Sequence, residues 1–465
     1  MKKVAIIGGG VAGVSAAILL KNAKITLFEK EKSLISGPPF CHLHAGGNLY
    51  PDISINQCIK LLKESIDFAK TYPFCLDFRP TIIAFPKDYE KEPTFQIKRL
   101  EILQKEYKKL INLDEKNSIL GDSREYFKLY HKKDLEKLSK KEIVKNPKNF
   151  DDWIIPFAKY VDLDNLQYPV IIVNEFGLNI FRLAAGTKMI LEKKDNVDLK
   201  LNTKVIDIKQ KDNRFVVSFL NDGSIKTETF DFIINAAGFR SGEIDDLLKL
   251  KRERFVEFKA AYVTKWDSSI KWPEIIFHGK RGTPKGMAQF TPYPNGYFQL
   301  HGMNKEITLF NEGLAKSSES SSQPKLKRVF LEKIEKGWDE KIAILRGENA
   351  IKHFEKFIKK FSNEAKATKK PLFGAQQIPG NDPELRAAEV SFEKNCARCE
   401  IVKVSSAIQM VKNIANEFGL EIENIDKFLK DLDLKKLKKK AKEIAKGRGY
   451  PQDLGDITTS NRLFS

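Results

Sequence analysis

The sequence lacks several features that define other classes of protein. Its 465 residues include no uninterrupted apolar run of about 18 residues, which is the length that a transmembrane helix needs. The five cysteines are odd in number and irregularly spaced, which excludes a disulfide framework. Met1-Lys2-Lys3 passes directly into an apolar stretch and a glycine-rich turn, so no signal peptide is expected. We therefore expect a cytoplasmic protein.

The sequence also has fewer acidic than basic residues. The chain has 81 Lys and Arg residues against 62 Asp and Glu residues, a net charge of +19. Such an excess attracts polyanions but does not specify a fold. A general enrichment in lysine produces the same excess, so the charge alone does not predict a nucleic-acid-binding protein.

The N-terminal residues follow the pattern of a βαβ unit. Residues 3–7 form a short apolar run typical of a buried parallel strand. The turn Gly8–Gly13 follows, then a helix is predicted at 14–21 and a second strand at 25–29. The second strand ends at Glu29, 16 residues after the last glycine of the turn. This whole unit is a far more specific signal than an isolated GxGxxG motif.

Each residue type in this unit has a physical role in dinucleotide binding. Gly8 allows the tight turn, Gly10 lets the backbone approach a diphosphate, and Gly13 allows close packing of helix and strand. The helix N-terminus offers N–H groups and a positive dipole end to the diphosphate. Glu29 accepts hydrogen bonds from ribose hydroxyls and disfavours the 2′-phosphate of NADP. The predicted cofactor-binding residues here are Gly8, Gly10, Val11, Ala12, Gly13, Glu29 and Lys30.

Two further stretches accompany this unit and favour FAD over NAD. Together with Val4–Glu29, the stretches Asp231–Gly238 and Ala397–Ala407 resemble the FAD-dependent oxidoreductase family of D-amino-acid oxidase, glycine oxidase and malate:quinone oxidoreductase. The resemblance implies that the second stretch closes the FAD site, preceded by a strand around Val205 that touches adenine. It implies that a helix N-terminus after the third stretch faces the flavin pyrimidine ring. The FAD contacts implied are Val205, Ala237 and Gly238. Lys403, Ser405 and Ser406 are candidates for the side of the flavin N1 and O2 atoms, where positive charge and helix N–H groups stabilise the reduced ring. The alternative for Lys403 is a solvated lysine at the end of a strand.

The chain lacks a second GxGxxG and a Cys-x4-Cys pair after Glu29, which argues against the disulfide-reductase flavoproteins. The single pair Cys396 and Cys399 has no second ligand pair nearby, so we predict no metal site and interpret both cysteines as incidental.

The stretch Gly37–Asn48 is rich in glycine and proline and holds two of the six histidines, His42 and His44. The resemblance implies that this loop crosses the flavin ring. On that basis His44, Ala45 and Gly46 are predicted to contact FAD, with His44 also a candidate base. Covalent attachment of the flavin to His42 or His44, and simple loop packing, remain alternatives.

The substrate side is predicted around residues 277–303. A carboxylate substrate favours a bidentate arginine, and Arg281 is the first candidate, followed by Arg79 and Arg240. His278 and His301 are candidates to orient a hydroxyl group or accept a proton. The alternative for each of these residues is a structural role, in an ion pair or a buried hydrogen bond.

Several other segments complete the predicted organisation. Residues 123–148 have helical character, 371–383 look like a loop, and 424–446 form one amphipathic basic helix. That helix packs on the rest of the protein, lies on an anionic membrane surface, or contacts nucleic acid. The last is least favoured, because no aromatic residues interleave the lysines.

We predict an α/β protein with a Rossmann-like FAD-binding domain (a parallel sheet with helices) interleaved with a mixed-sheet α+β substrate domain. The predicted boundaries are 1–84, 166–250 and 374–420 for the FAD-binding domain, 85–165 and 251–373 for the substrate domain, and 421–465 for a basic C-terminal helix and tail.

The predicted function is an FAD-dependent dehydrogenase or oxidase. It removes a hydride from the carbon that bears an amine or hydroxyl in a small carboxylate substrate, and it passes electrons to oxygen or quinone. The alternatives are a malate:quinone oxidoreductase-like dehydrogenase at the inner face of a membrane, a flavin-containing protein that binds or modifies RNA, and a flavin sensor without turnover. A flavin monooxygenase is disfavoured because its Gly-Asp-Ala motif is absent.

Overall fold

The computed structural model describes residues 1–36, 43, 53–383, 385, 390–401 and 403–459. Its N-terminal part is the βαβ unit that the sequence predicts. β1 (Lys2–Ile7) and β3 (Ala23–Phe28) pair in parallel, and α1 (Val11–Leu19) connects them. Both strands are apolar almost throughout, because both faces of their sheet are covered.

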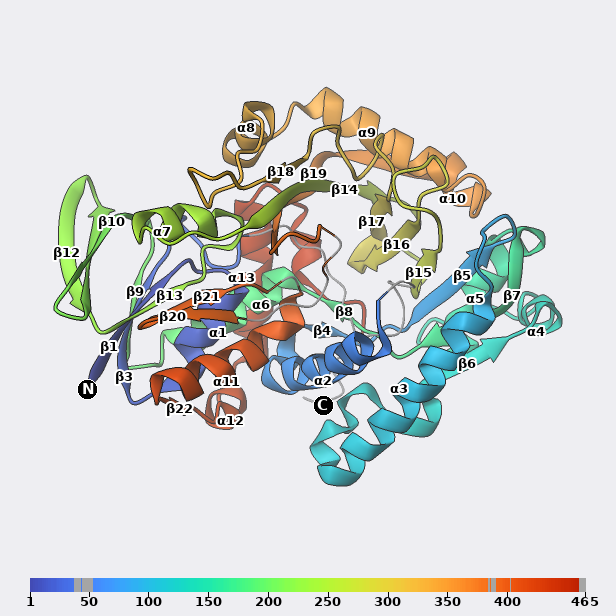
Figure 1. Ribbon diagram of the computed structural model, residues 1–465. Helices are drawn as coiled ribbons and strands as arrows, with labels where there is room; N and C mark the ends of the chain where they lie inside the picture. Colours follow the sequence, from blue (N-terminus) through green and yellow to red (C-terminus); the bar gives the residue numbers. More distant parts are fainter. Residues whose placement is uncertain (37–42, 44–52, 384, 386–389, 402, 460–465) are drawn as a thin grey trace.

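This unit belongs to a six-stranded sheet (Figure 1). Five neighbouring strands run parallel, and only the edge strand β20 is antiparallel to its partner. One face packs against helices, and the other against a three-stranded antiparallel sheet. The strand order is β20 (Val390–Glu393), β21 (Cys396–Cys399), β13 (Phe232–Asn235), β1, β3 and β9 (Val197–Lys200), and the three-stranded sheet is β10 (Thr203–Lys211), β11 (Arg214–Asn221) and β12 (Ser224–Phe230).

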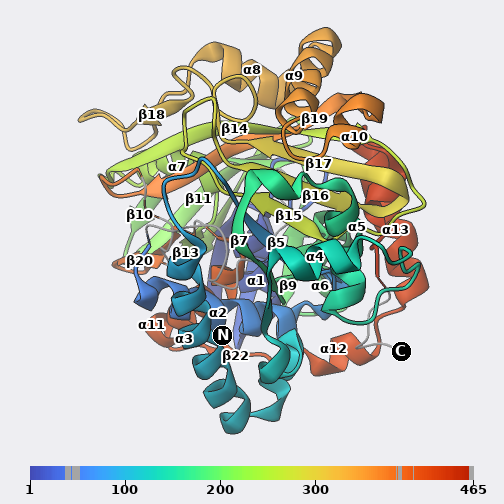
Figure 2. The same ribbon diagram turned by 90° about the vertical axis from the view of Figure 1, so that its right-hand side faces the viewer.

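A nine-stranded mixed sheet forms the other half of the molecule. Its outer face packs against α5, α9 and α10 through a cluster rich in aromatic residues. Figures 1 and 2 show α8, α9 and α10 side by side above this sheet. The strand order is β18 (Leu314–Lys316), β14 (Arg254–Lys265), β17 (Tyr297–Gly302), β16 (Ala288–Tyr293), β15 (Glu274–Phe277), β5 (Thr81–Pro86), β7 (Leu166–Val173) and β6 (Phe127–Tyr130), with β19 (Lys366–Pro379) along the other edge of β14.

The helices cover both sheets and fill the junction between them. None of the helices in the described ranges is both long enough and apolar enough to cross a bilayer. Their bounds are α2 (Ile55–Thr71), α3 (Pro93–Leu113), α4 (Lys132–Leu138), α5 (Phe150–Tyr160), α6 (Ile180–Leu191), α7 (Ser241–Leu247), α8 (Arg328–Lys336), α9 (Glu340–His353), α10 (Lys359–Glu364), α11 (Ala407–Phe418), α12 (Asp426–Lys430) and α13 (Leu434–Gly447).

The prediction of a loop at 371–383 is wrong, because residues 371–379 belong to the 14-residue strand β19. Its glycine and proline content suggested a loop. Within the described residues, β19 pairs with β14 alone, so one side of the strand makes no ladder hydrogen bonds. Proline, which has no N–H to donate, is tolerated at such an edge.

Two helix predictions also need correction. The stretch 123–148 contains strand β6 followed by the short helix α4, because Phe127–Tyr130 pairs with β7. The basic helix at 424–446 is two helices, α12 and α13. The break comes at Asp433, whose side chain accepts a hydrogen bond from the N–H of Lys436 and caps α13.

Candidate active site

The glycine-rich turn joins β1 to α1 and leaves open space in front of the helix. Gly8 has φ +107°, a conformation that favours glycine. A Cβ at Gly13 would lie 1.9 Å from the carbonyl oxygen of Gly8, so only glycine allows this close packing. Among the described residues, a Cβ at Gly10 would meet nothing within 4 Å, and no side chain caps the start of α1. The N–H groups of the first helical turn are therefore arranged to receive an anion.

Glu29 follows β3 directly and is buried beside this turn. Its carboxylate accepts hydrogen bonds from the backbone N–H of Gly9 at 2.6 Å and of Glu31 at 2.8 Å. Burial raises the pKa of Glu29, and these two hydrogen bonds oppose the rise. Lys30 is exposed and lies 3.5 Å from a carboxylate oxygen of Glu31.

The second predicted stretch lies directly against the glycine-rich turn. The N–H of Ala236 donates to the carbonyl oxygen of Ile7 at 2.9 Å, and a Cβ at Gly8 would lie 2.4 Å from the carbonyl oxygen of Ala236. Ala237 and Gly238 come next, after the end of β13. Val205, on β10, is buried in the apolar cluster that also contains Ile7.

Lys403, Ser405 and Ser406 precede α11, next to α2. Ser406 Oγ donates to Glu64 Oε2 of α2 at 2.6 Å. The hydroxyl of Ser405 is buried and has no hydrogen-bond partner among the described residues. A buried hydroxyl of this kind is available to form a hydrogen bond with a ligand. Lys403 is 8% exposed.

These segments meet because four neighbouring strands, β21, β13, β1 and β3, run parallel. Their carboxyl ends therefore share one edge of the sheet, where ligands bind in open α/β sheets. The turn, Glu29, the Ala237 stretch and the Lys403 stretch each follow one of these ends. The predicted contacts His44, Ala45 and Gly46, together with His42, lie outside the described residues.

The inner face of the nine-stranded sheet is polar although it is largely buried. Along β14, β16 and β17, alternate residues point to the outer aromatic cluster and to this face. We call the following set the inner polar face: Glu257, Lys259, Glu274, Gln289, Thr291, Tyr293, Gln299 and His301.

Two predicted catalytic residues, Arg281 and His301, lie at this face. Arg281 shares an ion-pair partner with Lys259, and the charge of Lys259 acts on His301. Arg281 forms an ion pair with Glu257, whose other oxygen lies 2.7 Å from Lys259 Nζ. His301 Nδ1 lies 3.2 Å from Gln289 Oε1. Burial, assisted by the charge of Lys259, lowers the pKa of His301 to about 4. His301 is therefore neutral at pH 7.

His278 follows β15 and is 4% exposed. Its ring stacks on Phe85 with centroids 4.6 Å apart, and its backbone N–H donates to the carbonyl oxygen of Ala84 at 2.9 Å. Tyr89 stacks on the same ring at 5.9 Å. His278 is thus held in a fixed orientation.

The two alternative arginines make ion pairs within the fold. Arg79 is 2% exposed and lies 2.6 Å from Glu274. Arg240 pairs with Glu243 at 2.6 Å and with Glu335 at 2.7 Å.

Glu257, Lys259 and Gln289 are not among the residues predicted from the sequence. The signal for them was the alternation of polar and apolar residues along their strands. Polar and apolar residues alternate at residues 297–301 of the sequence. Such alternation does not tell which strands are neighbours in the sheet or which other element each face of the sheet contacts.

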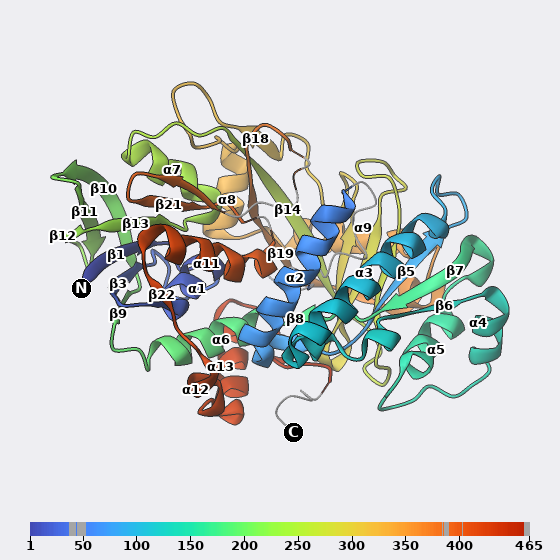
Figure 3. The same ribbon diagram turned by 60° about the horizontal axis from the view of Figure 1, so that its bottom comes forward.

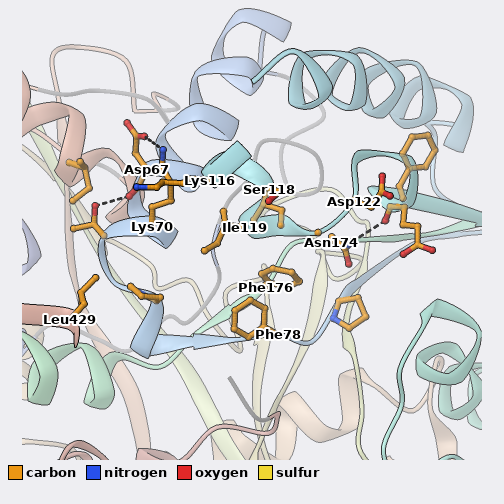
Figure 4. Close-up of a pocket in the computed structure, with 18 of the residues that line it drawn as sticks. Asp67, Lys70, Phe78, Lys116, Ser118, Ile119, Asp122, Asn174, Phe176 and Leu429 are labelled. Carbon is orange, nitrogen blue, oxygen red and sulfur yellow. Dashed lines mark hydrogen bonds and ion pairs between the residues drawn. The ribbon is translucent and has the colours of Figure 1, made fainter. Parts of the chain in front are cut away.

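A groove of about 1240 Å³ lies elsewhere on the molecule. Figure 4 shows Phe78 and Phe176 near its centre, with Lys70, Lys116 and Asp67 at one end. None of the predicted site residues that the structure describes lines it.

Comparison with known proteins gives matches at the level of the fold. No protein-family model and no curated protein matches the chain. Glycine oxidase from Geobacillus kaustophilus superposes with a TM-score of 0.56 at 12% identity, over 92% of this chain and 98% of that chain. L-alpha-glycerophosphate oxidase from Mycoplasma pneumoniae, whose structure has FAD bound, gives 0.54 at 15% identity over 91% and 97%. L-amino acid deaminase from Proteus vulgaris gives 0.55 at 11% identity over 94% and 96%.

The chain has the fold of these oxidoreductases. The likeness extends over nearly the whole of each chain, so it includes both sheets. It confirms the predicted fold class and, at the level of the fold, the resemblance to the family of glycine oxidase.

Proposed function

We propose that this protein is an FAD-dependent oxidoreductase. It removes a hydride from the carbon bearing an amine or hydroxyl in a small carboxylate substrate and passes the electrons to oxygen or quinone. The observation that carries the proposal is the open glycine-rich turn with Glu29 beside it, at the carboxyl edge of a sheet of this fold. The division into an FAD-binding domain and a substrate domain, with the boundaries predicted above, is part of the proposal.

The residues at the sheet edge fit the parts of FAD. N–H groups at the start of α1 receive the diphosphate, and Glu29 accepts hydrogen bonds from ribose hydroxyls. Lys403 and Ser405 supply positive potential and a donor at the flavin pyrimidine side. The flavin supplies the hydride acceptor, while the protein binds and orients both reactants.

The inner polar face supports a substrate site. Arg281 and Lys259, which share Glu257, supply the positive charge that a carboxylate needs. His301 is neutral at pH 7 and its lowered pKa makes it a weak base, so we assign it the orientation of the substrate amine or hydroxyl through a hydrogen bond. His278, fixed by its stacked aromatic neighbours, orients the substrate.

Anaerobic reduction tests this proposal. The purified flavoprotein is mixed without oxygen with a panel of 2-amino acids, 2-hydroxy acids and the matching amines and alcohols without a carboxylate. We expect one of the acids to bleach the flavin and its analogue without a carboxylate not to do so. If the flavoprotein stays oxidised with every acid, the substrate assignment is wrong. Admission of air, or of a soluble quinone, to the reduced enzyme then identifies the electron acceptor.

A second candidate is a quinone-reducing dehydrogenase. It would be a cytoplasmic protein that binds to the inner face of a membrane. The observation that favours it is the set of exposed lysines on α13, which include Lys435, Lys436 and Lys439. Basic surface helices bind anionic lipid. Cosedimentation with anionic vesicles but not with neutral vesicles supports it, and equal recovery with both argues against it.

A further inference from the structure

We propose that the C-terminal segment 434–459 positions the FAD-binding turn, through Arg448, and thereby determines the affinity for FAD. This inference rests on the proposed function and adds a determinant that lies outside the βαβ unit. Figure 3 shows α13, which begins the segment, beside α6 at the lower side of the molecule.

The glycine-rich turn is supported by the short stretch Ser33–Ile35. The N–H of Ile35 donates to the carbonyl oxygen of Gly9 at 2.8 Å. The side chain of Leu34 packs so closely on Gly9 that a Cβ there would lie 2.6 Å from Leu34 Cδ2. Contacts to this stretch therefore fix the shape of the turn.

Ile35 has a backbone conformation that it would not adopt without support. Its φ is +53°, in the left-handed region, which is rare for a β-branched residue. Such a conformation persists only where the surroundings impose it. Two contacts that hold Ile35 in this conformation are the hydrogen bond from its N–H to Gly9 and the hydrogen bond that its carbonyl oxygen accepts from Arg448.

Arg448 binds all three residues of the stretch. Its Nη1 donates to the carbonyl oxygen of Ile35 at 3.0 Å. Its Nη2 donates to the carbonyl oxygen of Leu34 at 2.7 Å and to Ser33 Oγ at 3.2 Å. All three acceptors are neutral, and Arg448 makes no ion pair among the described residues. Burial lowers its pKa to about 10, so the guanidinium stays charged at neutral pH.

Arg448 is itself held on both sides. Its guanidinium lies 5.7 Å from the ring centroid of Phe181 on α6, and its carbonyl oxygen accepts a hydrogen bond from Lys370. Tyr450 donates to the carbonyl oxygen of Pro371 at 3.0 Å. These contacts tie the segment to α6 and to β19.

The segment is also packed along its length. Leu437, Ala441 and Ala445 of α13 are fully buried. Asp456 pairs with Lys438 at 2.7 Å, which closes the end of the segment on α13. A side chain on this well-packed segment can impose a fixed geometry on the loop that it contacts.

Arg448→Met tests the inference, with Arg328→Met, an exposed arginine of α8 outside the proposed sites, as matched control. FAD is titrated into each apoprotein, and thermal unfolding is recorded with and without FAD. We expect the Kd for FAD to rise at least about tenfold in Arg448→Met, equivalent to roughly 1.4 kcal/mol, and to stay within about twofold in the control. Stabilisation by added FAD should shrink in parallel.

Arg448→Lys provides a second variant in case the methionine variant does not fold. A lysine keeps the charge but lacks the planar fork, so we expect it to weaken FAD binding to an intermediate extent. A purely structural role for Arg448 predicts a less stable apoprotein whose folded fraction binds FAD with the wild-type Kd. That result, in either variant, overturns the inference. Failure of the wild-type chain to bind FAD would instead overturn the proposed function.

Discussion

Replacement of Gly10 by alanine separates the proposed FAD contact from the stability of the fold. A Cβ at Gly10 meets no atom of the part of the chain that the structure describes within 4 Å, and the residue has an ordinary φ of −70°. Alanine is a poorer N-cap than glycine but restricts the unfolded chain, so the free energy of unfolding should change by less than about 1 kcal/mol. The added methyl group occupies the space that we assign to the diphosphate. We therefore expect the Kd for FAD to rise at least about tenfold, or roughly 1.4 kcal/mol.

Gly13→Ala is the matched comparison in the same turn. Its Cβ would lie 1.9 Å from the backbone oxygen of Gly8, so α1 must move away from β1. Overpacking of this kind costs about 1–3 kcal/mol or more, and the apoprotein itself should lose stability.

Both variants are measured as apoproteins, by chemical denaturation and by fluorescence titration with FAD. The expected pattern is normal stability with weak binding for Gly10→Ala, and low stability for Gly13→Ala. Wild-type affinity in Gly10→Ala would refute the placement of the diphosphate at this turn.

Three further predictions concern buried charged groups and histidines. Glu29→Gln removes a carboxylate that accepts from two backbone N–H groups, so the free energy of unfolding should fall by about 1–3 kcal/mol and FAD binding should weaken; unchanged values of both would contradict the role of Glu29. Burial lowers the pKa values of His301 and His353 to about 4. Below about pH 6.5 the unfolded chain binds protons that the folded chain does not, so stability should fall from pH 6.5 toward pH 4, and less steeply in the double His→Gln variant. An equal slope in that variant would exclude these two histidines as the cause. Asp245 is fully buried between Arg254 and Arg398. In the variant Asp245→Asn, the free energy of unfolding measured by chemical denaturation should fall by about 3–5 kcal/mol, because both arginines lose their charged partner. A fall below about 1 kcal/mol would show that these ion pairs contribute little to stability.

The βαβ unit was predictable because its signals are local. The spacing from Gly8 to Glu29 reflects contacts within one short stretch of chain, and the fold likeness agrees with it. Strand β19 was not predictable from local composition. Its pairing with β14 is formed by residues more than a hundred positions apart, and Pro371 and Gly374 suggested a loop in their own neighbourhood.

The candidate site divides in the same way. Glu29 follows a recognisable strand, so its place at the sheet edge could be inferred. Arg281 could be selected only by its residue type, because its ion pair with Glu257, 24 residues earlier, depends on how β14 is placed in the folded sheet. The grouping of His301 with Gln289 required knowledge of which strands are neighbours and which face they present.

The most direct test of the central claim is the flavin content of the purified wild-type protein. The visible absorption spectrum is recorded as isolated and after addition of FAD, and the flavin released on denaturation is identified as FAD, FMN or neither. The account predicts the spectrum of a bound oxidised flavin and the release of FAD in a stoichiometry near one per chain. A colourless protein that does not bind added FAD would contradict it.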